Sequence, residues 1–254
     1  MTQQGALRIC LVGATGLVGS AIISEAVGRT DVRIIGVGRR EADLPPGARM
    51  EMLVGEPIDW PALIRAARAD VFVCALGTTM KAAGSREQFR AIDHELVRFA
   101  AEGAREAGIE RMVLVSSIGA DRDAANFYLR VKGETEDALA RLGFSRLDIL
   151  RPALLRGTRK DRRPLERAAQ WLAPLADLLV LHGPWRRFRT IRARDLARAA
   201  ISLASETREG RFVHEHDALR ELAQGRGVSP HSLGGCRDAP VDSSPVLNQG
   251  YGTR

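Results

Sequence analysis

Short apolar runs rich in valine, isoleucine and leucine recur along the first 150 residues, and amphipathic stretches separate them. Runs of this kind are typical of parallel strands that are buried on both faces of a sheet. The predicted strands are 7–12, 32–37, 50–54, 70–76, 111–116 and 146–151, and the predicted helices are 17–28, 60–69, 86–108 and 126–143. The alternation predicts an α/β fold with a doubly wound parallel sheet of Rossmann type, in the strand order 3-2-1-4-5-6.

The pattern changes after the sixth predicted strand. Residues 163–182 and 193–205 are predicted to be helical, and residues 211–215 to be one more short strand. We therefore expect one domain over residues 1–222, in which residues 153–222 form a small C-terminal portion on the substrate side. From Gly225 onward, 13 of the 30 residues are glycine, proline or serine, so residues 223–254 are predicted to be a disordered tail or a sequence artefact.

The composition argues against several classes of protein. Hydrophobic residues make up 45% of the chain, but no run approaches the roughly 20 apolar residues that a membrane span needs. Cys10 and Cys74 fall in predicted buried strands and Cys236 in the tail, which indicates neither a disulfide framework nor a metal site. The N-terminus lacks the basic and apolar pattern of a signal peptide, so we expect a cytoplasmic location.

The net charge of +7 raises the question of nucleic-acid binding. The arginines are spread along the chain, however, and no specific nucleic-acid interface is expected. Two arginine clusters stand out, at residues 156–163 and 186–189. They are interpreted as solvated loops or, alternatively, as the border of a site for an anionic substrate or for cofactor phosphates.

Tyr128 and Lys132 are the first candidate catalytic residues. The chain has only two tyrosines and three lysines, and one of each stands four residues apart in a predicted helix. That spacing places both side chains on one helical face, where an ammonium favours the phenolate and lowers a tyrosine pKa that is otherwise about 10. The alternative is a surface tyrosine that packs on a lysine stem.

A glycine-rich turn connects the first predicted strand to the first predicted helix. Its spacing is Gly-x-x-Gly-x-x-Gly, and a strand, a glycine turn and a helix together form a dinucleotide-binding fingerprint. An ordinary tight turn is the alternative. The candidate cofactor-binding residues here are Gly13, Thr15, Gly16, Leu17, Val18 and Gly19.

Two further strand ends carry candidate cofactor contacts. Arg39 and Arg40 follow the second strand, where an NAD site usually has an acidic residue, so NADP is favoured over NAD. Leu76, Gly77 and Thr78 follow the fourth strand, where glycine permits a close backbone approach and threonine offers a hydroxyl.

Two serines follow the fifth strand, and either could bind a substrate carbonyl. Ser117 is the preferred candidate and Ser116 the other; a helix cap or a turn serine is the alternative interpretation.

These segments together carry a resemblance to a known family. The glycine loop, the serine pair and Tyr-x-x-x-Lys resemble the atypical branch of the short-chain dehydrogenase/reductase superfamily. Four segments over about residues 7–220 are similar to the Tat-interacting-protein family of NADP-binding oxidoreductase-like proteins. They are Ala75–Thr79, Val115–Asp121, Tyr128–Glu134 and Arg151–Gly157.

The resemblance implies a role for each matching residue. Tyr128 would be the general acid/base, Lys132 would depress its pKa and bind the nicotinamide ribose, and Ser117 would polarise the substrate carbonyl. The superfamily often has an asparagine on the preceding helix, and Asp93 stands near that place in this chain.

Two functions follow from the resemblance and the motifs. The first is an NADPH-dependent oxidoreductase that acts on a carbonyl or alcohol in a small-molecule substrate. The alternative is an NADPH-binding regulatory or scaffold protein with little turnover, which acts through a protein partner. The substrate and the oligomeric state are left open.

Overall fold

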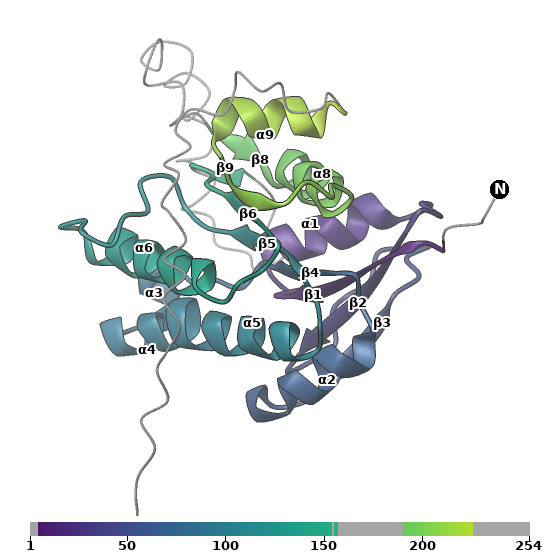
Figure 1. Ribbon diagram of the computed structural model, residues 1–254, viewed down its shortest axis with the longest axis horizontal. Coiled ribbons are helices and arrows are strands. Elements are labelled where there is room, and N and C mark those ends of the chain that lie inside the picture. The colour runs from purple at the N-terminus through teal and green to yellow at the C-terminus, as the bar shows by residue number, and fades with distance from the viewer. Residues whose placement is uncertain (1–4, 154, 157–189, 226–254) are drawn as a thin grey trace, which may run out of the picture.

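The computed structural model describes residues 5–153, 155–156 and 190–225 (Figure 1). Seven strands form one sheet in the order β3-β2-β1-β4-β5-β6-β9, and every pairing in it is parallel. The strands are β1 (Leu7–Val12), β2 (Val32–Gly38), β3 (Glu51–Val54), β4 (Val71–Cys74), β5 (Arg111–Val115), β6 (Arg146–Leu150) and β9 (Gly210–His214). The predicted order of the first six strands is confirmed, and β9 adds a seventh strand at the edge beside β6.

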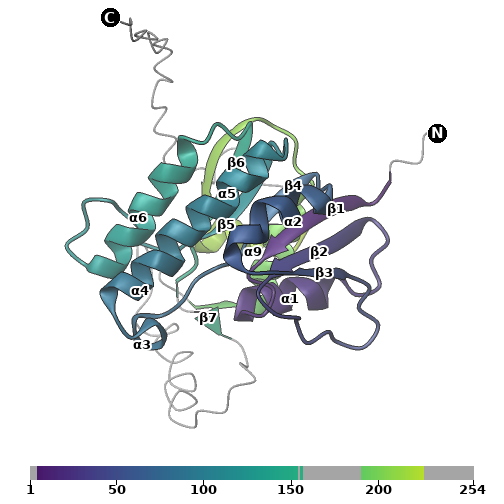
Figure 2. The same ribbon diagram turned by 90° about the horizontal axis from the view of Figure 1, so that it is seen from below.

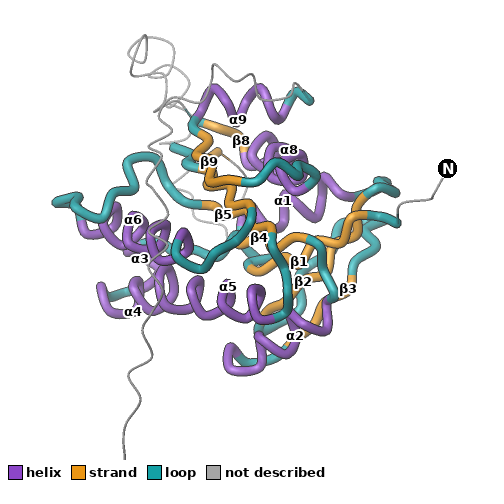
Figure 3. The backbone as a smooth tube through the Cα atoms, in the orientation of Figure 1, coloured by secondary structure: helices purple, strands orange, loops and turns teal. Residues whose placement is uncertain are grey.

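Helices cover both faces of the sheet, which runs between two helical layers (Figures 2 and 3). One layer holds α1 (Leu17–Ala26), α8 (Ala193–Ala204) and α9 (His216–Ala223), and the other holds α2 (Trp60–Ala67), α5 (Val97–Glu106) and α6 (Phe127–Ala140). Alternate residues of a strand point to opposite layers, so Ile9 and Leu11 pack with α1 while Cys10 and Val12 pack with α2 and α5. This double burial explains why the strands appear in the sequence as continuous apolar runs.

The predicted helix 86–108 is a composite. It begins with α4 (Arg86–Arg90), continues as a π-helical turn, η2 (Ala91–Leu96), and ends with α5. Gly108 follows with a φ of 82°, the left-handed conformation that ends a helix readily at glycine. The π-helical turn was not predicted from the sequence, although its residues fall where the family resemblance placed an important side chain.

Several short elements complete the described part of the chain. They are η1 (Pro57–Asp59), α3 (Met80–Ala83) and a small two-stranded parallel sheet of β7 (Leu155–Arg156) and β8 (Ile191–Arg192). The predicted helix 163–182, Cys236 and the tail from residue 226 lie outside the described residues. So do both arginine clusters, apart from the backbone of Arg156. That residues 153–222 form the substrate side stays a prediction.

Candidate functional site

The carboxyl ends of β1, β4, β5 and β6 meet at one edge of the sheet, and the order of strands reverses between β1 and β4. In open α/β sheets, ligands bind beyond this edge at the point of reversal. The glycine loop follows β1, Ala75 to Thr78 follow β4, and the serine pair follows β5. The fold therefore brings the three sequence motifs to a common edge.

Close packing accounts for the glycines of the loop. Gly13 has a φ of 89°, and a Cβ placed there would lie 2.5 Å from the carbonyl carbon and oxygen of Ala75. A Cβ at Gly19 would lie 2.1 Å from the carbonyl oxygen of Gly13. Gly16 is the N-cap of α1 and has no side chain with which to cap the helix, so the first backbone N–H groups of α1 can receive an anion.

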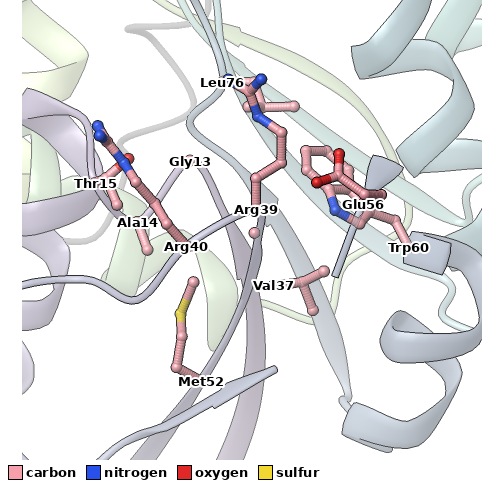
Figure 4. Close-up of a pocket in the computed structure, with 11 residues that line it drawn as sticks. Gly13, Ala14, Thr15, Val37, Arg39, Arg40, Met52, Glu56, Trp60 and Leu76 are labelled. Carbon is pink, nitrogen blue, oxygen red and sulfur yellow. The ribbon is translucent and has the colours of Figure 1, made fainter. Parts of the chain in front are cut away.

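A cavity of about 460 Å³ lies beside this loop, at the ends of β1, β2 and β3 (Figure 4). It is lined by Gly13, Ala14, Thr15, Val37, Gly38, Arg39, Arg40, Met52, Glu56, Trp60 and Leu76. In Figure 4 the side chain of Arg40 extends toward Thr15, whereas that of Arg39 extends toward Leu76. We call this the β1–β3 cavity.

Five residues predicted to bind the cofactor line the β1–β3 cavity: Gly13, Thr15, Arg39, Arg40 and Leu76. Met52, Glu56 and Trp60 also line it but were not predicted. Met52 lies on β3 and the other two follow it, so the rule that ligands lie beyond the strand ends would have found Glu56 and Trp60. The glycine loop and the exposed arginines fit a dinucleotide. The carboxylate of Glu56 adds an acidic group to the cavity, which the sequence did not predict.

The predicted residues Gly77 and Thr78 lie instead beside a buried ion pair. Lys132 Nζ is 2.7 Å from Asp93 Oδ1, and both side chains are buried. The other oxygen of Asp93 accepts a hydrogen bond of 2.8 Å from the backbone N–H of Thr78. A Cβ at Gly77 would lie 3.3 Å from Asp93 Oδ1 and 3.5 Å from Lys132 Nζ, so glycine lets the backbone approach the pair.

The local structure of α6 positions Tyr128 and Lys132. Asn126 Oδ1 accepts a hydrogen bond from the backbone N–H of Leu129, which caps the helix just before Tyr128. Tyr128 is partly buried, and its ring centroid lies 5.3 Å from that of Phe89. Burial by itself lowers the pKa of Lys132, but Asp93 and Tyr128 raise it, and the net pKa lies above the usual value. Lys132 is therefore an ammonium at neutral pH.

The π-helical turn brings Asp93 to this position. A π-helix has a wider turn than an α-helix and leaves carbonyl groups without their regular partners. The hydroxyl of Thr135 lies 3.0 Å from the carbonyl oxygen of Asp93 and 2.7 Å from that of Val131. Thr135 thus joins α6 to the π-helical turn, one helical turn beyond Val131 and next to the ion pair.

The two serines differ in their partners. Ser116 is buried, and its hydroxyl donates a hydrogen bond of 2.5 Å to Glu136 Oε1. Arg151 donates to the same carboxylate, with its Nη2 2.5 Å from Glu136 Oε2. Ser117 is partly exposed, and within the described part of the chain its hydroxyl makes a single long contact, 3.4 Å to the carbonyl oxygen of Ile118. The hydroxyl of Ser116 is committed to this network, which the sequence did not predict.

Within the described residues, no helix is long and apolar enough to cross a membrane. No group of three or more histidine, cysteine, aspartate or glutamate side chains there is arranged to hold a metal ion.

The chain is similar to curated proteins from fungi. It is 34% identical over 210 residues to the mitochondrial protein fmp52-1 of Aspergillus terreus, a match that covers 80% of this chain and 89% of the relative. It is 35% identical over 204 residues to the mitochondrial protein FMP52-1 of Scheffersomyces stipitis, with 78% and 88% covered. These names contradict the expected cytoplasmic location. That expectation was wrong because it rested on the absence of one kind of signal, and other targeting segments have other compositions.

Solved structures with the same fold include an enzyme in complex with NAD+ and an epimerase with UDP-glucose. WbmH of Bordetella bronchiseptica, in complex with NAD+, superposes with a TM-score of 0.62 over 86% of this chain and 79% of WbmH, at 18% identity. The UDP-glucose 4-epimerase of Thermotoga maritima, with UDP-glucose, gives a TM-score of 0.61 over 87% of this chain and 84% of the epimerase, at 14% identity. At these identities the likeness concerns the fold alone.

The family model described as NAD(P)H-binding matches residues 13–170, which span the glycine loop, the ion pair and the serine pair. The family match, the Fmp52 relatives and the fold agree with the superfamily that the motifs indicated. The chain belongs to the NAD(P)H-binding family and is a relative of the fungal Fmp52 proteins.

Proposed function

We propose that this protein is an NADPH-dependent oxidoreductase that acts on a carbonyl or alcohol. The observation that carries the proposal is the position of Tyr128 next to the buried ammonium of Lys132, at the sheet edge that also bears the glycine loop. A phenol beside a fixed cation is suited to transfer a proton near neutral pH.

The cofactor would lie across this edge of the sheet. Gly13, Thr15 and the first turn of α1 would hold the diphosphate, and the β1–β3 cavity would hold the adenosine. Arg39 and Arg40 would pair with a 2′-phosphate, which supports NADPH over NADH. When bound, the nicotinamide ring supplies or accepts the hydride.

The chain's own residues would handle the proton and the carbonyl. Tyr128 would donate its phenolic proton to the developing alkoxide in reduction, or accept a proton from the alcohol in oxidation. Ser117 would hydrogen-bond the carbonyl oxygen, because the hydroxyl of Ser116 is already donated to Glu136. Lys132 would favour the phenolate electrostatically and bind the nicotinamide ribose.

A second candidate is an NADPH-binding regulatory protein with little turnover. The observation that favours it is Asp93, which contributes a negative charge where the superfamily often has a neutral asparagine. That charge offsets the ammonium on which the proton transfer depends. A protein partner would then be the functional target.

The test is NADPH oxidation with a panel of aldehydes, ketones and quinones. If the protein is an enzyme, Tyr128→Phe should lower turnover by roughly 10²–10⁴ and leave NADPH affinity nearly unchanged, because only a hydroxyl is lost. Tyr251→Phe makes the same chemical change at the chain's other tyrosine and should have no effect.

A wild-type rate that survives Tyr128→Phe would refute this mechanism. Tight NADPH binding with no turnover on any compound would instead favour the regulatory protein.

A further inference from the structure

The carboxylate of Asp93 is enclosed entirely by protein. Its exposed fraction is 0%. One oxygen accepts from Thr78 N–H at 2.8 Å, and the other lies 2.7 Å from Lys132 Nζ. Among the described residues, that second oxygen has no hydrogen-bond partner beyond this ionic contact. Asp93 is therefore held on one side by the backbone after β4 and directed at a single cation.

An amide at this position would leave a different charge beside Tyr128. An asparagine can hold Lys132 by a hydrogen bond but carries no charge, so the ammonium would act on the phenol at full strength. A carboxylate at 2.7 Å makes the pair neutral overall, and the field that reaches Tyr128 is that of a small dipole.

Two further ionisable groups in the described structure near the pair carry little charge at neutral pH. Burial raises the pKa of Cys74, on β4, to about 11, so its thiol is uncharged at neutral pH. Burial and the nearby Arg90 lower the pKa of His94, whose Nδ1 is 3.1 Å from the Thr135 hydroxyl. Both groups therefore add little positive or negative charge near Tyr128.

The charged side chains on the adjoining elements have partners of their own. Arg90 of α4 forms an ion pair with Glu134 of α6, and Glu136 of α6 pairs with Arg151 after β6. Arg86 and Arg130 lie over the Phe127 ring, 5.2 Å and 5.7 Å from its centroid. Among the described residues, Lys132 is thus the cation that interacts with Tyr128, and Asp93 is the partner of that cation.

We propose that Asp93 is a positioning residue that fixes the Lys132 ammonium and compensates its charge, so that Tyr128 releases its proton at a higher pH than Lys132 alone would set. The proposal deepens the proposed function and rests on it for its role in catalysis. Its physical core concerns the phenol itself, which can be measured without turnover.

The experiment titrates Tyr128 by tyrosinate absorbance in the absence of cofactor. In a Tyr251→Phe background Tyr128 is the sole tyrosine, so the whole signal comes from it. Asp93→Asn keeps the shape of the side chain and removes its charge, and the titration midpoint of Tyr128 should fall by about 1 to 2 pH units. Asp137→Asn is the matched control, because Asp137 lies on the same helix as Tyr128 and pairs with Arg122 at the surface. In this control the titration midpoint of Tyr128 should not move.

A double variant covers the case in which Asp93→Asn does not fold. The double variant Asp93→Asn, Lys132→Met removes both charges, and Tyr128 should titrate less than about one pH unit above the wild type, because Asp93 already offsets most of the effect of the Lys132 ammonium on the phenol. A double variant that titrates more than about one unit above the wild type would overturn the proposal, since the ammonium would then act uncompensated in the wild type.

An unchanged midpoint in folded Asp93→Asn would overturn it as well. Either result leaves the proposed oxidoreductase function standing, because that function is judged by turnover.

Discussion

The β1–β3 cavity and the Asp93–Lys132 pair lie at the same edge of the sheet, but the cations of the cavity are exposed and the cation of the pair is buried. Arg39 and Arg40 are exposed, and no carboxylate is joined to either in the described structure. Lys132 is buried and lies 2.7 Å from its carboxylate. Exposed cations keep their hydration and attract a ligand from a distance, whereas a buried pair depends on its geometry. The cavity therefore fits ligand capture, and the pair fits control of a proton.

Removal of Lys132 is expected to have the largest effect on stability. Lys132→Met leaves the Asp93 carboxylate buried without its counter-ion, which should cost about 3–5 kcal/mol in the free energy of unfolding. Urea denaturation measures the difference. Lys81→Met is the control, because Lys81 is exposed and its removal should leave the midpoint where it was. If Lys132→Met lost as little stability as the Lys81→Met control, the Asp93–Lys132 ion pair would not be formed in the folded protein.

Loss of the charge on Glu136 is expected to have an intermediate effect. Glu136→Gln leaves Arg151 without its anion and changes the acceptor of the Ser116 hydroxyl, at an expected cost of about 1–3 kcal/mol. Glu134→Gln makes the same change two residues away, in a partly exposed pair with Arg90, and should cost at most about 1 kcal/mol. Thermal or urea unfolding compares the two variants directly. Equal losses of stability in the two variants would show that the buried ion pair of Glu136 is worth no more than the partly exposed ion pair of Glu134.

The arginines of the β1–β3 cavity should affect binding rather than folding. NADPH is expected to bind at least about ten times tighter than NADH, a difference of about 1.4 kcal/mol. Arg39→Ala and Arg40→Ala should each reduce this ratio, with little change in the unfolding midpoint, because both side chains are exposed. Arg65→Ala, on the exposed side of α2, should keep the ratio. Calorimetric titration measures the two affinities in each variant. Equal affinities of the unmodified protein for NADPH and NADH would contradict the proposed preference for NADPH.

The same contrast separates what the sequence could predict from what it could not. The strands and the glycine loop could be predicted because their signals are local: β-branched runs for β1 to β6, and glycines where the loop packs on Ala75. The Ser116–Glu136 contact could not, because it joins residues 20 positions apart, and the partner of Lys132 lies on another helix. Such pairs depend on how α6 packs against its neighbours. The family resemblance indicated Asp93 from its position in the sequence, but its contact with Lys132 could be identified only from the folded structure.

The π-helical turn at Ala91–Leu96 makes the length of this helix a determinant of the site. A π-helical turn is equivalent to one extra residue in an α-helix, and one residue corresponds to a rotation of about 100°. Deletion of a single residue from this turn would allow a regular helix to form. The segments on either side of the turn, including Phe89 in the core, would keep their present orientation, but Asp93 lies within the turn and would lose the backbone geometry that directs it at Lys132. The composition of the chain would barely change, but the site would lose the turn that carries its buried carboxylate.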